Sequence, residues 1–215
     1  MIPLVKLKNC KTILLYGGTF DPPHLAHVVL PQLAREAIGA DAVVYIPAAH
    51  APHKPGTKPT AAEHRLAMLK LALRGVKHAV VLTDELDRAA QGAKGPSYTV
   101  DTLEALRARL GPGPRFRLLI GADNLRIFDK WKNPARIIEL AEPVVMVRPP
   151  DTKASLLRSL PGGYLRKEWS RRLVDLPQFE LSATQIRSRV AMGRSITGMV
   201  CPAVERYIAR HRLYR

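Results

Sequence analysis

Residues 13–27 read ILLYGGTFDPPHLAH, an apolar run followed by a glycine pair and two histidines. The apolar run Ile13–Tyr16 has no polar alternation, which is typical of a strand buried on both faces in a parallel sheet. Gly17–Gly18 let the backbone turn tightly and a ligand approach closely. His24 and His27 follow, three residues apart, so both can lie on one face of a helix start. Imidazoles beside helix N-terminal amides form an anion site suited to phosphoryl or nucleotidyl transfer.

The same residues also have simpler explanations. A turn rich in Gly and Pro needs no function, and the two histidines could be surface residues. His-x-x-His could hold a metal ion, but no third ligand lies nearby, so no metal site is predicted. A dehydrogenase-type dinucleotide site would need G-x-G-x-x-G here, and that pattern is absent. If the anion site is real, Thr19 adds a hydroxyl donor to it.

Strand-like and helix-like segments alternate along the rest of the chain. Four more short apolar runs predict strands: Val43–Ile46, Ala79–Leu82, Phe116–Ile120 and Val144–Val147. Between them, Leu66, Leu69 and Leu73 have helical spacing behind a capping box, Thr60-x-x-Glu63. A second helix runs from Val100 to Leu110 and ends at Gly111-Pro112. The pattern predicts an α/β fold: a Rossmann-like doubly wound open sheet, mostly parallel.

Three segments are less regular. Residues 24–38 look helical but contain Pro31, so the helix either begins near Val28 or is kinked. Residues 156–170 contain Pro161-Gly162-Gly163 and look like a connecting excursion. Helices are expected at Thr184–Met192, with Gly193 at its end, and at Pro202–Arg210. With no repeat and no linker, we expect a single domain over residues 1–215, with a helical C-terminal portion of about 182–215.

Composition excludes several classes of protein. A hydrophobic content of 47% with 24% charged residues is ordinary for a globular protein and argues against disorder. No apolar run approaches the ~18–20 residues of a membrane span, and no secretory signal is expected at the start. Cys10 and Cys201 are the only cysteines, which excludes a disulfide scaffold. A reducing, cytoplasmic location is therefore expected.

The chain is strongly basic, with 34 Lys and Arg against 18 Asp and Glu, a net charge of +16. Residues 111–215 hold 20 of these basic residues and 9 of the acidic ones. The basic residues are scattered, with Arg166-Lys167 and Arg171-Arg172 as the densest pairs. The charge alone leaves nucleic-acid binding and binding of small anionic substrates equally open.

Gly17–His27 resembles the GGTFDPxHxGH signature of the nucleotidylyltransferase superfamily, α/β enzymes that transfer a nucleoside monophosphate from a nucleoside triphosphate. One departure is Ala26, where the signature has glycine. Pro52-His53-Lys54 resembles the PPHK-type loop of nicotinate-nucleotide adenylyltransferases, although alone it could be a solvated basic loop. Ser97-Tyr98-Thr99 resembles the same family's SYT element, although Ser97 could simply cap a helix.

Two further segments extend the resemblance toward the C-terminus. Gly121-Ala122-Asp123, with Trp131 eight residues after Asp123, resembles the family's GxDxL…W segment, although Trp131 could be an ordinary core or rim aromatic. Leu181–Arg187 resembles the ISSTxIR motif in a Ser-Ala-Thr form, although it could be a plain helix cap. Most of these segments follow predicted strands, as does Arg148. Because the loops after parallel strands line one crevice, we expect these residues to converge there.

The resemblance implies adenylyl transfer from ATP to nicotinate mononucleotide in NAD biosynthesis, giving nicotinate adenine dinucleotide and pyrophosphate, with Mg²⁺ carried mainly by ATP. It assigns catalysis to His24, His27 and Thr19. The implied ATP-binding residues are Gly17, Gly18, Thr19, His24, His27, Asp123, Ser182, Thr184 and Arg187. The implied mononucleotide-binding residues are His53, Lys54, Tyr98, Thr99 and Trp131.

Three alternatives remain at this point. A sister adenylyltransferase acting on nicotinamide mononucleotide or phosphopantetheine shares the first motif, but Ser97-Tyr98-Thr99 and Trp131 disfavour it. A tRNA-synthetase-like protein would need a KMSKS-like lysine loop, and Leu181–Arg187 is not one. A non-catalytic nucleic-acid-binding protein would need exposed aromatics among its basic residues, and aromatics are 6% of the chain. We therefore expect small-molecule substrates, no nucleic-acid partner and no membrane.

Overall fold

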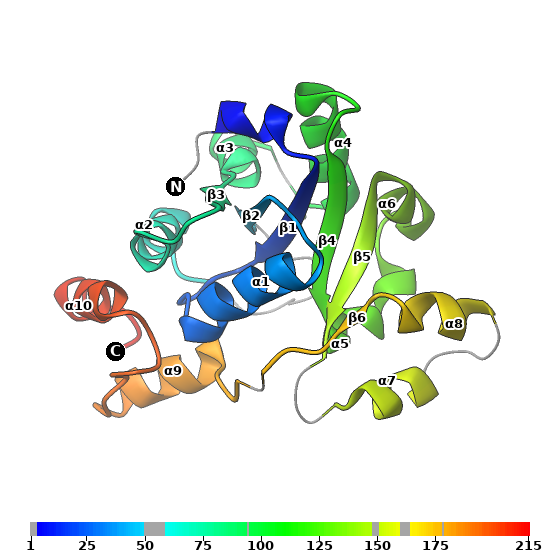
Figure 1. Ribbon diagram of the computed structural model, residues 1–215. Helices are drawn as coiled ribbons and strands as arrows, with labels where there is room; N and C mark the ends of the chain where they lie inside the picture. Colours follow the sequence, from blue (N-terminus) through cyan, green and yellow to red (C-terminus); the bar gives the residue numbers. More distant parts are fainter. Residues whose placement is uncertain (1–3, 50–58, 94, 148–150, 160–163, 178) are drawn as a thin grey trace.

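A computed structural model describes residues 4–49, 59–93, 95–147, 151–159, 164–177 and 179–215. Its centre is a six-stranded sheet in the order β3-β2-β1-β4-β5-β6, in which every neighbouring pair is parallel (Figure 1). The strands are β1 (Thr12–Gly18), β2 (Ala42–Pro47), β3 (Ala79–Val81), β4 (Arg115–Gly121), β5 (Ala141–Met146) and β6 (Leu173–Val174). The predicted doubly wound, Rossmann-like open sheet is confirmed.

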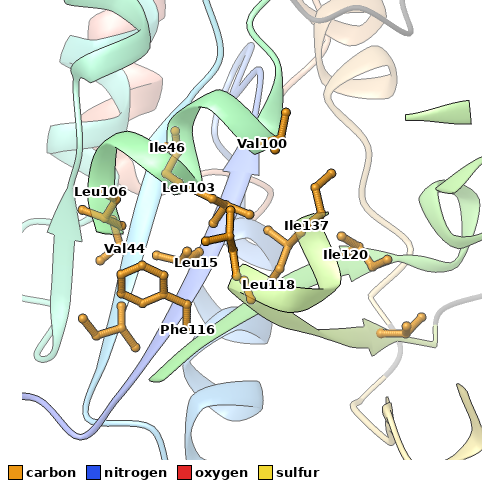
Figure 2. Packing of buried hydrophobic residues seen from close by; sticks show 14 of the residues in the cluster. Leu15, Val44, Ile46, Val100, Leu103, Leu106, Phe116, Leu118, Ile120 and Ile137 are labelled. Atoms are coloured by element: carbon orange, nitrogen blue, oxygen red, sulfur yellow. The ribbon is translucent and has the colours of Figure 1, made fainter. Parts of the chain in front are cut away.

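Helices cover both faces of the sheet. On one face, α4 (Thr99–Leu110) and α6 (Pro134–Leu140) pack on side chains of β1, β2 and β4. Figure 2 shows Leu103 and Leu106 of α4 lying over strand residues such as Leu15 and Phe116. On the other face, α1 (Leu25–Ala37) and α2 (Ala62–Ala72) pack on the opposite side chains of the same strands. The central strands are therefore buried on both faces, which is why their sequences lack alternation.

A separate apolar cluster joins the C-terminal helices to the rest of the chain. Residues of α9 (Ala183–Ala191) and α10 (Pro202–Arg210) pack on α2. Met68 of α2, Ile186 of α9 and Val204 of α10 are fully buried there. The C-terminal segment is thereby held beside α2, at the edge of the fold opposite α8 (Figure 1).

The remaining helices are short. They are η1 (Leu4–Asn9), α3 (Asp84–Ala90), α5 (Ala122–Leu125), η2 (Phe128–Lys130), α7 (Lys153–Ser159) and α8 (Tyr164–Ser170). Within the described residues, no helix is long and apolar enough to cross a membrane.

Two helix starts bear on the sequence-based predictions. Of the two alternatives for the helix containing Pro31, a start near Val28 is excluded, because α1 begins at Leu25 and proline lies inside it. The proposed capping box at Thr60 does not form, because Ala61 is the N-cap of α2 and makes no side-chain cap. The backbone N–H of Thr60 instead donates to the carboxylate of Asp21, 3.0 Å away.

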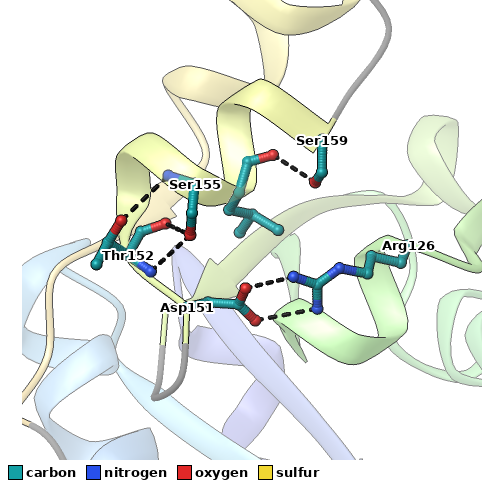
Figure 3. Close-up of polar contacts among 6 residues, drawn as sticks. Arg126, Asp151, Thr152, Ser155 and Ser159 are labelled. Carbon is teal, nitrogen blue, oxygen red and sulfur yellow. Dashed lines mark hydrogen bonds and ion pairs between the residues drawn. The ribbon is translucent and has the colours of Figure 1, made fainter.

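The stretch expected to be a simple connection contains two helices, α7 and α8. Leu156 of α7 and Trp169 of α8 bury their side chains in the core. The start of α7 is fixed by an ion pair between Arg126 and Asp151 and by hydrogen bonds between Thr152 and Ser155 (Figure 3). Helices of seven residues are too short for periodicity to reveal them.

Candidate active site

The loop after β1 is shaped by a buried aromatic ring. A Cβ placed on Gly18 would lie 3.0 Å from the ring of Phe20, so a larger residue there would force that ring to shift. Phe20 is 2% exposed and has a φ of 52°, in the left-handed region. Its ring meets those of Tyr16 and His27 edge-on, with centroids 5.7 and 5.2 Å away. Phe20 therefore supports the histidine that follows it.

His24 and His27 lie together at the start of α1. Their rings stack with centroids 3.6 Å apart, and His24 is 5% exposed. The backbone N–H of His24 donates to Nδ1 of His27 at 3.2 Å, which is half of a capping box. Because Nδ1 accepts this bond, the ring proton of His27 belongs on Nε2. His27 thus offers an N–H donor from a fixed ring.

The start of α9 lies against the same loop. Ser182 is the N-cap of α9, and its hydroxyl accepts from the backbone N–H of Gln185 at 3.1 Å. Arg187 donates from Nη1 to the backbone carbonyl of Asp21 at 2.8 Å and from Nη2 to Thr184 Oγ1 at 3.3 Å. One guanidinium donor is therefore used to hold the loop, and others remain for a ligand.

Asp123 lies in the first turn of α5, directly after β4. Because β4 pairs with β1, α5 begins at the same edge of the sheet as Gly17–Gly18. The side chain of Asp123 is exposed. Within the described residues, no group of three or more His, Cys, Asp and Glu could hold a metal ion.

Lys132, the residue after Trp131, contacts the start of α4. Tyr98 is the N-cap of α4 and Thr99 is its first residue, so the simpler alternative of a cap by Ser97 is excluded. The Lys132 ammonium lies 4.7 Å from the centroid of the Tyr98 ring and donates to the carboxylate of Asp101 at 2.9 and 3.0 Å. The segment that carries the half-buried Trp131 is thereby anchored to the start of α4.

A buried carboxyl, that of Glu85, contacts the first turns of α4. Glu85 of α3 is 7% exposed and accepts a hydrogen bond from the Thr102 hydroxyl at 3.0 Å. Burial raises the pKa of Glu85, while hydrogen bonds from the Thr102 and Ser97 side chains and the backbone of Ala49 oppose that rise. Glu85 therefore connects the end of β2 with the start of α4.

Sequence reasoning gave no role to three residues that contact the loop after β1 or the first turns of α4: Arg65, Glu85 and Tyr214. A helical projection could have found Arg65, because it shares one buried face of α2 with Met68, Leu69 and Ala72. A charged residue on an apolar face is unusual and indicates a specific partner. Tyr214 carries no such signal. Of the predicted site residues, His53 and Lys54 lie outside the described residues, as does Arg148.

Comparisons with known proteins show the family of this chain. The sequence model of the cytidylyltransferase-like family matches residues 15–189. A protein of Thermomicrobium roseum named "Probable nicotinate-nucleotide adenylyltransferase" is 39% identical, covering 94% of this chain and 90% of its own. One of the same name from Albidiferax ferrireducens is 40% identical, covering 95% and 98%.

A solved structure has a similar fold. The nicotinic acid mononucleotide adenylyltransferase of Plasmodium falciparum, complexed with NaAD, superposes with a TM-score of 0.68. The superposition covers 95% of this chain and 97% of that one, at 18% sequence identity. At this identity the likeness concerns the fold.

The raised pKa of Glu85 predicts a pH effect on stability. The folded state holds the Glu85 proton more tightly than the unfolded state, so raising the pH removes that proton at a greater cost in the folded state. Relative to Glu85→Gln, the wild type should therefore lose stability as the pH rises from about 4 to about 7. Urea unfolding at both pH values measures the difference. A difference that is constant, or that grows in favour of the wild type, would contradict the prediction.

Proposed function

The chain belongs to the nicotinate-nucleotide adenylyltransferases of the cytidylyltransferase-like family, and we propose that it transfers the adenylyl group of ATP to nicotinate mononucleotide. The products are nicotinate adenine dinucleotide and pyrophosphate, which places the reaction in NAD biosynthesis. The family assignment rests on identity over nearly the whole chain.

One observation carries the proposal. The loop after β1 brings two stacked imidazoles to a helix start, and Arg187 of α9 is hydrogen-bonded to that same loop. Imidazole N–H groups, hydroxyls and a guanidinium at a helix N-terminus are the donors that a nucleoside triphosphate requires. The edge of the sheet between β1 and β4 is where open α/β sheets bind nucleotides.

The reaction needs no covalent intermediate. The phosphate of the mononucleotide is ionised at neutral pH, so one of its oxygens attacks the α-phosphorus of ATP directly. The new P–O bond forms as the bond to the β-phosphate breaks, and pyrophosphate leaves with that electron pair. Catalysis then consists of in-line positioning and stabilisation of charge on the α-phosphate oxygens. We assign that stabilisation to Thr19, His24 and the Nε2–H of His27.

Other residues have binding roles in the proposal. Ser182, Thr184 and Arg187 hold the β- and γ-phosphates, and Gly17–Gly18 let the nucleotide approach the sheet. Asp123, exposed at the start of α5, fits the ribose or a cation carried by ATP. Mg²⁺ is usually held by one or two carboxylates together with substrate phosphates, and it neutralises phosphate charge when bound.

The nicotinate mononucleotide lies, in this proposal, at the start of α4. Tyr98 and Thr99 border the pyridine ring, and Trp131 stacks on it, because an electron-poor ring is attracted to an indole face. His53 and Lys54 meet its phosphate. The Lys132 link between Tyr98 and the segment of Trp131 supports this arrangement, because it keeps the two aromatic side chains in one region.

The activity is tested by pyrophosphate release from ATP and Mg²⁺. Nicotinate mononucleotide should be the best acceptor when it is compared with nicotinamide mononucleotide and phosphopantetheine. A preference for either of the other two would reassign the substrate within the superfamily. Release with none of them would refute adenylyl transfer.

His27→Ala should lower kcat on the order of 10²-fold or more, because it removes a donor that acts in the transition state. Folding, followed by thermal unfolding, should remain intact. His211→Ala removes an exposed imidazole after α10 and should keep wild-type turnover. Turnover close to wild type in His27→Ala would exclude the catalytic assignment.

Trp131→Ala should raise KM for nicotinate mononucleotide about tenfold, as expected for loss of a stacking partner, and leave KM for ATP unchanged. Trp169→Ala is a matched control, because Trp131 and Trp169 both pack against Phe128, with ring centroids 5.3 and 5.5 Å away. The control should lower stability without a selective effect on either substrate. An equal rise in both KM values in Trp131→Ala would contradict stacking on the pyridine.

A further inference from the structure

The segment after α10 reaches back to the loop that carries the catalytic histidines. The hydroxyl of Tyr214 donates to Oδ1 of Asp21 at 2.6 Å. Asp21 is 7% exposed and lies three residues before His24. The bond joins residues 193 positions apart, so it links the C-terminal segment directly to the loop after β1.

Asp21 is bound on its other sides as well. Its Oδ2 accepts from the backbone N–H of Thr60 at 3.0 Å, and its backbone carbonyl accepts from Arg187 at 2.8 Å. Three separate parts of the chain therefore bind one residue of the loop. The Tyr214 hydroxyl is the only one of these three donors that is neither a backbone group nor a proposed ligand of ATP.

A buried cation completes the network. Arg65 is 1% exposed and donates from Nη1 to the carbonyls of Thr19 and Ala48, both at 2.8 Å, and from Nε to the carbonyl of Thr60 at 2.9 Å. The backbone of Thr60 thus lies between the two charges, with its N–H on Asp21 and its carbonyl on Arg65. The loop is held at Thr19 by Arg65 and at Asp21 by Tyr214.

The Tyr214 hydroxyl is suited to donate this hydrogen bond at every working pH. Burial and the neighbouring carboxylate of Asp21 both raise the pKa of the Tyr214 hydroxyl. The group therefore keeps its proton throughout the pH range in which the enzyme would work. A hydrogen bond from a neutral donor to a buried carboxylate is among the stronger ones in proteins.

We propose that Tyr214 is a positioning residue for adenylyl transfer, whose hydroxyl acts through Asp21 to fix the loop that presents Thr19, His24 and His27 to the α-phosphate. This inference rests on the proposed function. Tyr214 does not touch the substrate. Its loss leaves the ligand-binding groups present but lets the loop depart from the geometry that the reaction requires.

Tyr214→Phe tests this role, because it removes the hydroxyl and keeps the ring. We expect kcat to fall about tenfold, with KM for both substrates within about twofold. Backbone amides of residues 17–27 should exchange hydrogen faster in the variant, as measured by mass spectrometry on the protein without substrates.

Tyr207→Phe is the matched control. Tyr207 is also a half-buried tyrosine of the C-terminal region, and its hydroxyl lies 2.9 Å from Nδ1 of His64 on α2. Its removal weakens the attachment of α10 to α2 without touching Asp21. It should lower the thermal unfolding midpoint by a similar amount and leave kcat and the exchange of residues 17–27 unchanged.

The outcomes separate the two proposals. Equal losses of kcat in the two variants would show that the hydroxyl of Tyr214 acts only through stability, and would overturn the inference. A wild-type kcat in Tyr214→Phe, or a raised KM with unchanged kcat, would also overturn it. Absence of pyrophosphate release by the wild type would refute the proposed function instead. In that case, unchanged amide exchange of residues 17–27 in Tyr214→Phe would still refute the link between Tyr214 and the loop.

Discussion

The parallel pairing of β1 with β4 joins the two halves of the sheet and sets where their connections separate. After β1 the chain proceeds to β2 and β3 on one side, and after β4 it proceeds to β5 and β6 on the other. Right-handed crossovers then put α1 and α4 on opposite faces of the sheet. The connections that leave β1 and β4 diverge, and the space between them is where a ligand can bind. The loop after β1 and helix α5 border this space because of strand order alone.

A second constraint comes from the charge of Arg65. Burial lowers the pKa of its guanidinium, and the nearby carboxylate of Asp21 opposes that effect. A buried charge without partners costs several kcal/mol, so its acceptors must lie where the guanidinium can reach them. Those acceptors are carbonyls of the segments after β1 and β2 and before α2. The position of one side chain in the core therefore determines the course of three surface segments.

The sequence predicted the parts of the molecule that depend on local pattern. The five longer strands and the helices Val100–Leu110 and Pro202–Arg210 were found because apolar runs and helical spacing reflect burial. Strand β6 has two residues, too few for any pattern. The predicted capping box at Thr60 was wrong, because the backbone N–H of Thr60 has a distant partner, Asp21. The alternative of a Ser97 cap is excluded for a similar reason, because the Ser97 side chain bonds to Glu85. The contact of Tyr214 could not be predicted, since its partner, Asp21, lies near the other end of the chain.

These contacts also bear on the anion site proposed at the loop after β1. Carbonyl oxygens repel phosphate, and those of Thr19 and Asp21 are instead turned toward Arg65 and Arg187. The carboxylate of Asp21 is likewise occupied by Tyr214 and the backbone of Thr60. With these acceptors satisfied, the loop lies beside the positive end of α1, which favours an anion. Arg65 and Arg187 thus have two effects, because they fix the shape of the loop and contribute positive potential beside it.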